Sequence, residues 1–245
     1  MKFKILYTLV LLSTFSCLEK PDANKIIDSA ITIAGGDLFV KSTVDFDFRG
    51  RHYKSIREGG TYQYERIFMD SLDTVRDVLK NDGFERFTNN QITNVADTMA
   101  VKYTASVNSV LYFALLPYGL NDAAVNKSYL GESTIKEEIY HKIKVTFQQE
   151  GGGEDYQDVF IYWVNKKTST VDYLAYSYEE ADGVGSRFRE AYNVRNVNGI
   201  RFVDHVNYKY EGNKFALADY DKAFEQGALK KLSVIELENV EVVLH

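Results

Sequence analysis

The sequence predicts a mainly β protein: a curled antiparallel sheet or half-open β-barrel, with two or so helices covering or filling its concave face. Many short segments alternate apolar and polar residues, as half-buried strands do. Glycine- and asparagine-containing turns join these segments at short spacing, which is typical of antiparallel hairpins. Only two segments have helical periodicity. Two helices are too few to build a separate layer, so the sheet has to curl or close to protect its edges.

The two helical segments have clear ends. Residues 23–34 carry apolar residues at helical spacing, with Asp22 placed as an N-cap and Gly35 as the stop. Residues 97–116 form the second such segment, which Pro117 ends because proline cannot continue a helix. This second helix interrupts the series of strands.

About ten antiparallel strands are predicted around that helix. From Val44 to Arg49, apolar residues alternate with charged ones, so the two sets point to opposite faces. The alternation slips near Ile235, which suggests a β-bulge in the last strand. The predicted strands cover residues 44–49, 52–57, 61–70, 73–80 and 83–88, then, after a loop at 121–127, a β region from Tyr129 with strands at 139–147, 159–164, 171–178, 187–194, 200–210 and 231–244.

The N-terminus has the order of a secretory signal. A basic start is followed by a short apolar run and small residues before Cys17, the single cysteine. The run is too short to span a bilayer. We therefore predict a signal peptide at residues 1–16, and a lipidated Cys17 with a polar tether at residues 17–22. The alternative is a secreted protein with an incidental cysteine near its cleavage site.

The remaining chain, residues 23–245, is predicted to be one domain, because no Ser/Gly/Pro-rich linker divides it. The formal net charge is −6, and it becomes −8 once Lys2 and Lys4 leave with the signal peptide. An acidic surface disfavours nucleic acid as a partner. The expected location is the envelope of a Gram-negative bacterium, at the outer membrane, with the lipid anchor as the membrane attachment.

No catalytic or metal-binding signature is present. His52, His141, His205 and His245 form no pair with metal-ligand spacing, and no cofactor is expected. The Gly151-Gly152-Gly153 run is interpreted as a hairpin turn, because no phosphate-binding helix follows it. The sequence therefore favours a non-catalytic protein.

Arginines and tyrosines on the predicted strands are the candidate ligand-binding residues. Arginines at the opening of a cavity are suited to bind a carboxylate or phosphate head group by bidentate hydrogen bonds. The competing interpretation is an exterior ladder of cross-strand ion pairs, which also involves Glu65, Glu190 and Arg201. Tyrosines line apolar pockets with a polar tip. The candidates are Arg49, Arg51, Tyr64, Arg66, Tyr112, Tyr162, Tyr176, Arg187, Arg189 and Tyr192.

The sequence resembles an uncharacterised family of Bacteroidetes-type lipoproteins, and through its order of elements the LolA/LolB-like superfamily. That resemblance implies a half-open β-barrel with helical lids around an apolar cavity for acyl chains, in an envelope protein. It implies no activity. It covers roughly residues 24–210 and is carried by the segments 34–36, 47–53, 62–66, 106–113, 116–122, 129–132, 142–153, 162–163, 172–176 and 187–192.

Three hypotheses for function follow. The first is a lipoprotein that binds a lipid or other apolar molecule in the curled sheet, beneath the helix at 97–116. The second is a structural or interaction lipoprotein whose interior is filled and whose outer face docks an unidentified envelope partner. An apolar void of about 300 Å³ or more favours the first, and a solid interior the second. The third and weakest is an enzyme that uses Glu65, Glu150 or Glu190 beside an arginine.

Cys17→Ser tests the predicted anchor. Without the thiol, neither lipid attachment nor the cleavage that depends on it can occur, while the domain still folds because Cys17 precedes every predicted element. We expect labelled palmitate to enter the wild type and not the variant, and the variant to leave the membrane fraction or to accumulate as uncleaved precursor. Equal labelling of both proteins would contradict the prediction.

Overall fold

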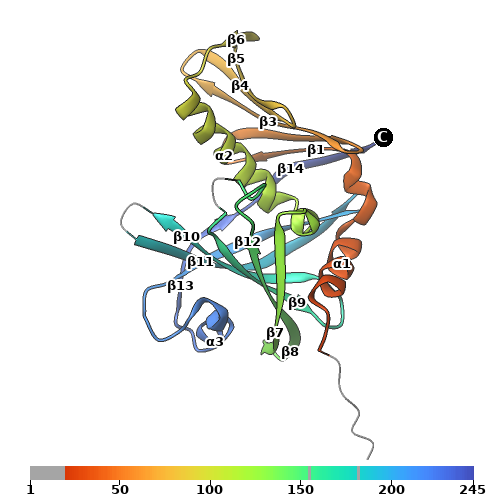
Figure 1. The fold of residues 1–245 in the computed structure, drawn as a ribbon, viewed down its shortest axis with the longest axis vertical. Helices are drawn as coiled ribbons and strands as arrows, with labels where there is room; N and C mark the ends of the chain where they lie inside the picture. Colours follow the sequence, from red (N-terminus) through yellow and green to blue (C-terminus); the bar gives the residue numbers. More distant parts are fainter. Residues whose placement is uncertain (1–19, 154–155, 181–182) are drawn as a thin grey trace, which may run out of the picture.

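The computed structural model describes residues 20–153, 156–180 and 183–245; the predicted signal peptide and Cys17 lie outside them. It confirms the predicted fold class. Two seven-stranded antiparallel sheets make up most of the molecule and do not close into a barrel (Figure 1). None of the helices in these residues is long and apolar enough to span a membrane.

The first sheet has the order β14-β1-β2-β3-β4-β5-β6. Consecutive strands are joined by tight turns, as at Arg49-Gly50, where both residues have positive φ, 50° and 69°. This is the backbone that a two-residue hairpin turn requires. The strands are β1 (Lys41–Phe48), β2 (Arg51–Glu58), β3 (Thr61–Asp70), β4 (Asp73–Lys80), β5 (Gly83–Thr88), β6 (Gln91–Thr93) and β14 (Glu238–Leu244).

The second sheet has the order β13-β12-β11-β10-β9-β8-β7, so it is a meander of neighbouring strands. Its inner strand β9 is buried along almost its whole length, as its continuous apolar run indicates. The strands are β7 (Val125–Ile135), β8 (Glu138–Phe147), β9 (Val159–Asn165), β10 (Val171–Glu180), β11 (Gly183–Val197), β12 (Ile200–Tyr210) and β13 (Leu229–Ile235).

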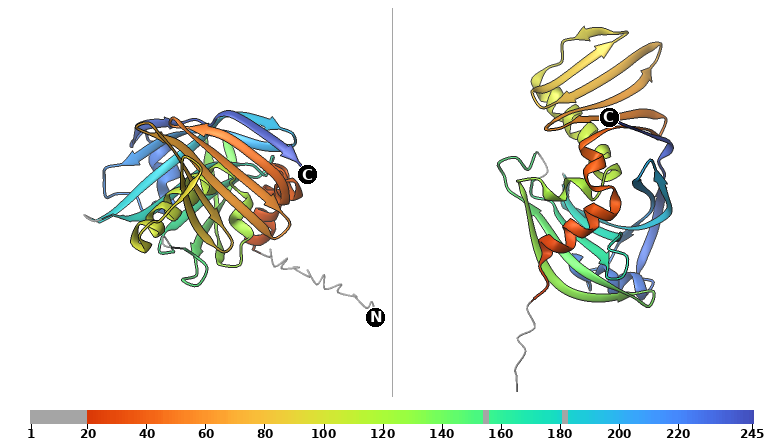
Figure 2. Two further views of the ribbon diagram at one scale, coloured as in Figure 1. Left: turned by 90° about the horizontal axis from the view of Figure 1, so that it is seen from above. Right: turned by 90° about the vertical axis from the view of Figure 1, so that its right-hand side faces the viewer.

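Two helices lie between the sheets. Figures 1 and 2 show α1 (Ala23–Ala34) and α2 (Asp97–Ala114) there. The Asp22 carboxylate caps α1 by accepting a hydrogen bond from the Asn24 amide at 2.9 Å, as predicted. Gly35 ends α1 with φ 141°, and a Cβ there would lie 3.1–3.3 Å from Phe39 and Ile200.

A third helix, α3 (Tyr220–Glu225), was not predicted from the sequence. It is six residues long, too short to give a helical period. It packs against the face of the second sheet that carries Tyr173 and Phe188, with Phe224 5.1 Å from the Phe188 ring. The short 3₁₀ segments are η1 (Gly36–Val40), η2 (Tyr118–Asn121) and η3 (Leu217–Asp219).

Three hydrophobic clusters form the core. The first joins Val107 and Leu111 of α2 to Phe46 of the first sheet and Phe202 of the second. The second packs α1 and the end of α2 on β8, β9 and β10, and the third lies under α3. The buried members of all three clusters lie between residues 23 and 242. A protein of residues 22–245, without the segment that precedes Asp22, therefore contains the whole of this core.

The predicted single strand at 231–244 is wrong. Instead of a bulge near Ile235, the chain leaves the edge of the second sheet after β13 and enters the edge of the first sheet as β14. Asp204, only 2% exposed, holds this crossover by accepting hydrogen bonds from the Leu237 amide at 3.0 Å and from Arg195 at 3.0 Å. Arg195 in turn donates to the Leu237 carbonyl at 2.6 Å.

Asp204→Ala tests the importance of the crossover. It leaves the half-buried Arg195 guanidinium and the Leu237 amide without the Asp204 acceptor, so we expect a loss of about 2–3 kcal/mol in the free energy of unfolding by denaturant. Asp219→Ala, which removes an exposed pair with Lys222, is the matched control and should cost about 1 kcal/mol or less. Similar losses for the two variants would contradict the role given to Asp204.

Candidate functional site

The ten predicted site residues fall in five places. Four of them, from α2, β9, β10 and β11, meet at the C-terminal end of α2. Two others, Tyr64 and Tyr192, are bonded elsewhere: Tyr64 accepts a hydrogen bond from Arg57 at 2.5 Å, and Tyr192 donates to Glu236 at 2.8 Å. The places are Tyr112, Tyr162, Tyr176 and Arg189 at the end of α2; Arg66 beneath its N-terminal half; Tyr64 beside Arg57; Tyr192 beside the crossover; and Arg49, Arg51 and Arg187 near the open side between the sheets.

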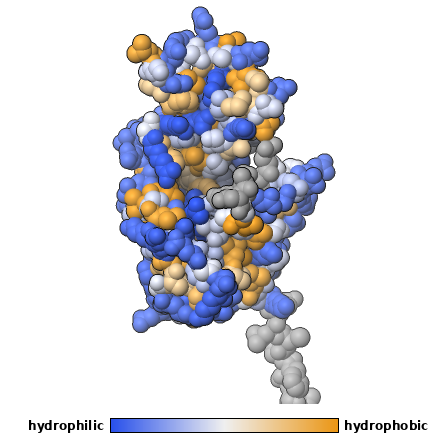
Figure 3. Space-filling view, turned by 90° about the vertical axis from the view of Figure 1, so that its left-hand side faces the viewer, coloured by the Kyte–Doolittle hydropathy of each residue, from blue (hydrophilic) through white to orange (hydrophobic). Residues whose placement is uncertain are grey.

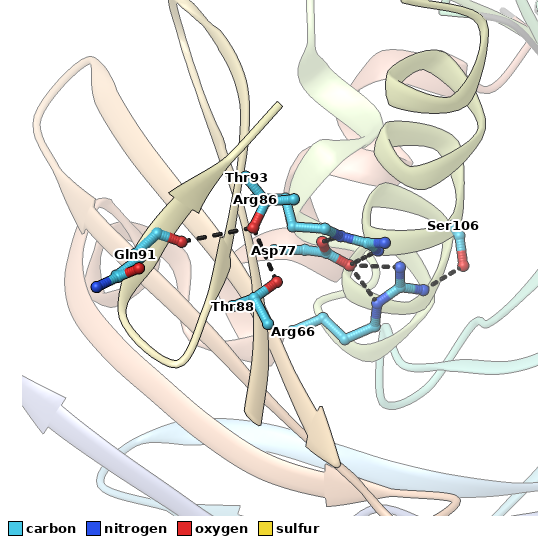
Figure 4. Close-up of polar contacts among 7 residues, drawn as sticks. All are labelled: Arg66, Asp77, Arg86, Thr88, Gln91, Thr93 and Ser106. Carbon is cyan, nitrogen blue, oxygen red and sulfur yellow. Dashed lines mark hydrogen bonds and ion pairs between the residues drawn. The ribbon is translucent and has the colours of Figure 1, made fainter. Parts of the chain in front are cut away.

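Arg66 belongs to a buried ion-pair network beneath α2 (Figure 4). Its guanidinium donates to Asp77 at 2.6 and 3.1 Å, and Arg86 donates to the same carboxylate at 2.6 and 3.0 Å. The Asp77 side chain is fully buried and that of Arg66 is 5% exposed. Arg66 also donates to the Ser106 hydroxyl of α2 at 2.6 Å. Its donors are thus used to hold α2, which gives Arg66 a structural role.

The contacts that hold α2 on the first sheet are otherwise few. Of its eighteen residues only Val107 and Leu111 are fully buried. Ala96 stands at its N-cap and provides no side-chain hydrogen bond. Besides the Arg66–Ser106 bond, Tyr103 contacts the first sheet, with its ring 3.6 Å from the Arg86 guanidinium and 6.0 Å from the Phe84 ring.

An aromatic wall lies at the end of α2. The hydroxyls of Tyr112 and Tyr162 are 2.9 Å apart, and burial raises the pKa of both phenols, which stay neutral. Phe160 stacks on Tyr162 and on Tyr176, with ring centroids 5.9 and 5.3 Å apart. Phe113 packs on Tyr176 at 5.2 Å. These side chains fill the space between α2 and the second sheet.

Arg189 lies at the edge of this wall. It is 8% exposed, with its guanidinium 3.8 Å from the Phe113 ring. It donates one hydrogen bond, to the Tyr176 hydroxyl at 2.8 Å, and its Nε has no partner. Burial lowers the pKa of Arg189, and the positive charge of Arg49 lowers it further. Arg49 of the first sheet is thus an electrostatic neighbour of Arg189 in the second.

Arg49, Arg51, Arg187 and Arg189 are called the arginine group below. Arg49 was predicted at the end of the strand at 44–49, but it lies in the β1–β2 turn, and its guanidinium is over the Phe48 ring. Arg51 is over Phe68 at 5.1 Å, and Arg187 is over Tyr178 at 5.3 Å. In the part of the chain that the structure describes, no carboxylate lies within ion-pair distance of these four, so the predicted ion-pair ladder does not account for them.

The β1–β2 turn and the tips of β10 and β11 lie on the same side of the molecule (Figure 1). A space-filling view from that side shows a hollow between the two sheets, with hydrophobic atoms in it and hydrophilic residues around it (Figure 3). The arginine group and the aromatic wall therefore belong to the open side of the concavity.

Two further hollows lie along α1. One, of about 210 Å³, is beside Lys25, His141 and Lys166, and the other, of about 360 Å³, is beside Asp37 and Asp122. Both are open and have several charged side chains in their walls. Neither is the apolar void that would favour ligand binding.

Sequence reasoning missed Arg57, Phe113 and His205. Arg57 stacks on Tyr118 at 4.6 Å, and Phe113 covers Arg189. His205 is buried on β12, opposite Ala191, and so on the same face as Arg189. The one signal in the sequence was that Phe113 is next to the candidate Tyr112. The contacts of Arg57, Phe113 and His205 arise from the tertiary structure and leave no pattern in the sequence.

The glutamates weighed for an enzyme lie apart. Glu65 is 3.5 Å from Arg76, rather than beside Arg66, and Glu190 is paired with Lys136, rather than with Arg189. Glu150 is exposed in a turn. Within the described residues, no three His, Cys, Asp or Glu side chains are grouped to hold a metal ion.

Comparison with known proteins gives one family and several structures of low similarity. The model of a family of unknown function, DUF6503, matches residues 2–237. No curated protein matches the chain. A LolA superfamily protein from Nitrosomonas europaea is 12% identical, with TM-score 0.49 and 89% of this chain and 92% of that chain covered. A domain from Vibrio parahaemolyticus, described as an outer membrane lipoprotein-sorting protein, is 9% identical, with TM-score 0.47 and coverages of 91% and 94%.

His205 gives a pH prediction. Burial, with the charges of Arg189 and Arg201, lowers its pKa to about 3. The unfolded chain takes up this proton near pH 6.5, whereas the folded chain does not, so His205 contributes a loss of stability as the pH falls from 6.5 toward 3. We expect its imidazole NMR signal to stay constant down to pH 4, and His205→Gln to reduce the fall of Tm over that range. A titration of His205 near pH 6.5 would contradict this.

Proposed function

The chain belongs to the DUF6503 family of unknown function, and we propose that it is an outer-membrane lipoprotein, anchored through Cys17, that binds a lipid or another apolar molecule without catalysing a reaction. In this proposal the ligand occupies the concavity between the sheets, and α2 is the cover that admits it.

The observation that carries the proposal is the weak attachment of α2 over apolar surface. Two buried residues, one hydroxyl bond from Arg66 and the contacts of Tyr103 hold residues 97–111 of the helix, whereas Tyr112 and Phe113 at its end pack on the second sheet. A displaced α2 uncovers Phe46, Tyr53 and Leu79 of the first sheet. Apolar surface of this kind binds hydrocarbon, at roughly 25 cal/mol per Å² removed from water.

The uncovered surface would continue onto the second sheet. Residues of α2 belong to both of the clusters between the sheets: Val107 and Leu111 to the first, Tyr112 and Phe113 to the second. One movement of the helix therefore opens a single apolar surface that reaches from β1 to β10. Its hydroxyls, such as that of Tyr162, provide polar points for orienting a ligand.

A second function is favoured by the packing of the aromatic wall. The Tyr112–Tyr162 hydrogen bond and the stacked Phe160 leave this part of the interior filled. If α2 never moves, the protein is an interaction lipoprotein that docks an envelope partner with its outer surface.

A cross-link that fixes α2 separates the two functions. Residues 22–245 contain no cysteine, so Phe84→Cys with Tyr103→Cys places the only two thiols on β5 and α2, where the native rings are 6.0 Å apart. We expect saturable binding of the apolar fluorophore N-phenyl-1-naphthylamine by the wild type and by the unlinked double variant. A short bismaleimide linker should reduce that binding at least about tenfold, because α2 can no longer leave the sheet.

The matched control is the single Tyr103→Cys variant treated with the same reagent, which cannot form the link. Binding that survives the cross-link would show that α2 is not the cover. The absence of saturable binding by the wild type would reject ligand binding and leave the partner-docking function.

A further inference from the structure

We infer that the arginine group is the subsite for the head of an acidic amphiphile, a carboxylate or phosphate group carried on a hydrocarbon chain. This inference rests on the proposed function and specifies its ligand. The arginines would take the head at the open side of the concavity, while the chain lies along the aromatic wall and beneath α2.

The first support is the pairing of the arginines. Arg66, Arg86, Arg195 and Arg201 each have an aspartate within 3.5 Å, and Arg76 has Glu65. The arginine group has no carboxylate within that range in the described residues, although acidic side chains outnumber basic ones in the chain, 35 to 29. Arg57 is the one other arginine without a carboxylate partner in the described residues, and it donates to the Tyr64 hydroxyl instead. Four of the five unpaired guanidiniums therefore lie beside the hollow, where a bound anion would neutralise their charge.

The burial of Arg189 is the second support. A buried charge without a counter-ion is costly, and the low-dielectric surroundings strengthen any charge pair it can form. Among the described residues, Arg189 has the Tyr176 hydroxyl as its one acceptor, and its buried Nε has none. An oxyanion at this position would satisfy the Nε–H and offset the buried charge.

The arrangement on β11 is the third support. Arg187 and Arg189 are two residues apart on one strand, so their side chains leave the same face about 7 Å apart. The β1–β2 turn, which carries Arg49, lies on the same side of the molecule as the tips of β10 and β11 (Figure 1), and the charge of Arg49 contributes to lowering the pKa of Arg189. Guanidinium groups bind carboxylates and phosphates through two parallel hydrogen bonds, and several around one anion select for it.

Aromatic rings beside the arginines indicate an amphiphile, rather than a free anion, as the ligand. Arg189 lies on Phe113 and Tyr176, Arg187 on Tyr178, and Arg51 on Phe68. A charged head held at these guanidiniums places the attached chain directly against rings that continue beneath α2. Inorganic phosphate would gain nothing from this surface.

Calorimetric titration of residues 22–245 tests the inference with four probes: dodecanoate, dodecyl phosphate, dodecanol and inorganic phosphate, the amphiphiles at concentrations below micelle formation. We expect the two anionic amphiphiles to bind at least about tenfold more tightly than dodecanol, and inorganic phosphate to bind far more weakly than dodecyl phosphate.

Arg49→Gln and Arg187→Gln should each weaken the anionic amphiphiles about tenfold and leave dodecanol unchanged, because neither side chain is part of a buried pair. Lys167→Gln is the matched control. It removes one positive charge from the turn at the opposite end of β10 and should change nothing. Thermal melting verifies that each variant is folded.

Each other result is decisive. If dodecanol binds as tightly as dodecanoate and the arginine variants behave as wild type, the head-group subsite is rejected while the proposed function stands. If no twelve-carbon probe binds, both are rejected. If inorganic phosphate binds as tightly as dodecyl phosphate, or if Lys167→Gln weakens binding as much as Arg187→Gln, a specific subsite for an amphiphile is rejected.

Discussion

The buried carboxylate of Asp204 holds the point where the two sheets become one concave surface. The chain passes from β13 to β14 at Glu236-Leu237, and Asp204 and Arg195 bind both backbone groups of Leu237 there. An apolar turn could not do this, because buried amide and carbonyl groups need hydrogen-bond partners. Once the crossover is fixed, β14 supplies the partner of β1, and the first sheet is held over the second. The concavity, the position of both helices and the approach of Arg49 to Arg189 all depend on that placement.

The position of α2 over the first sheet is set by the ion-pair network of Arg66, Asp77 and Arg86, rather than by many large apolar side chains. Two guanidiniums share the single carboxylate of Asp77, which leaves a net positive charge in the buried network. Such a network adds little net stability, because desolvation offsets most of the attraction, but its fixed geometry specifies where a helix sits. The aromatic wall behaves differently. Most of its contacts are between aromatic rings, and the Tyr112–Tyr162 hydrogen bond is the directional contact that fixes the end of α2 on the second sheet.

Much of this arrangement follows from residue pattern alone. Alternation located most of the strands, and Asp22 with Gly35 located α1, because strand faces and helix caps depend on neighbouring residues only. The meeting of Tyr112, Tyr162, Tyr176 and Arg189 follows from a helix lying on a sheet. The crossover could not be predicted, since a slip in alternation is the same whether a strand bulges or changes sheets. Nor could the sequence separate Arg66 from Arg189. Both are arginines on strands facing inward, and only the register that brings Asp77 beside Arg66 distinguishes a paired arginine from an unpaired one.

The two helices of the concavity differ in how they are packed: the end of α1 is tightly enclosed, whereas few contacts hold α2 on the first sheet. A side chain at Gly35 would crowd Phe39 and Ile200 and would be strained at φ 141°, and α1 is joined through this glycine directly to η1 and β1. On its other side, Ile27 is completely buried in the second cluster. A pull on the chain before Asp22 would therefore be borne by the second sheet and the closely packed Gly35 junction, and it would reach α2 only at the C-terminal end of that helix, through the second cluster. With the proposed anchor at Cys17, tension on the chain would fall on α1 and the second cluster, and the part of α2 that lies on the first sheet would not carry it.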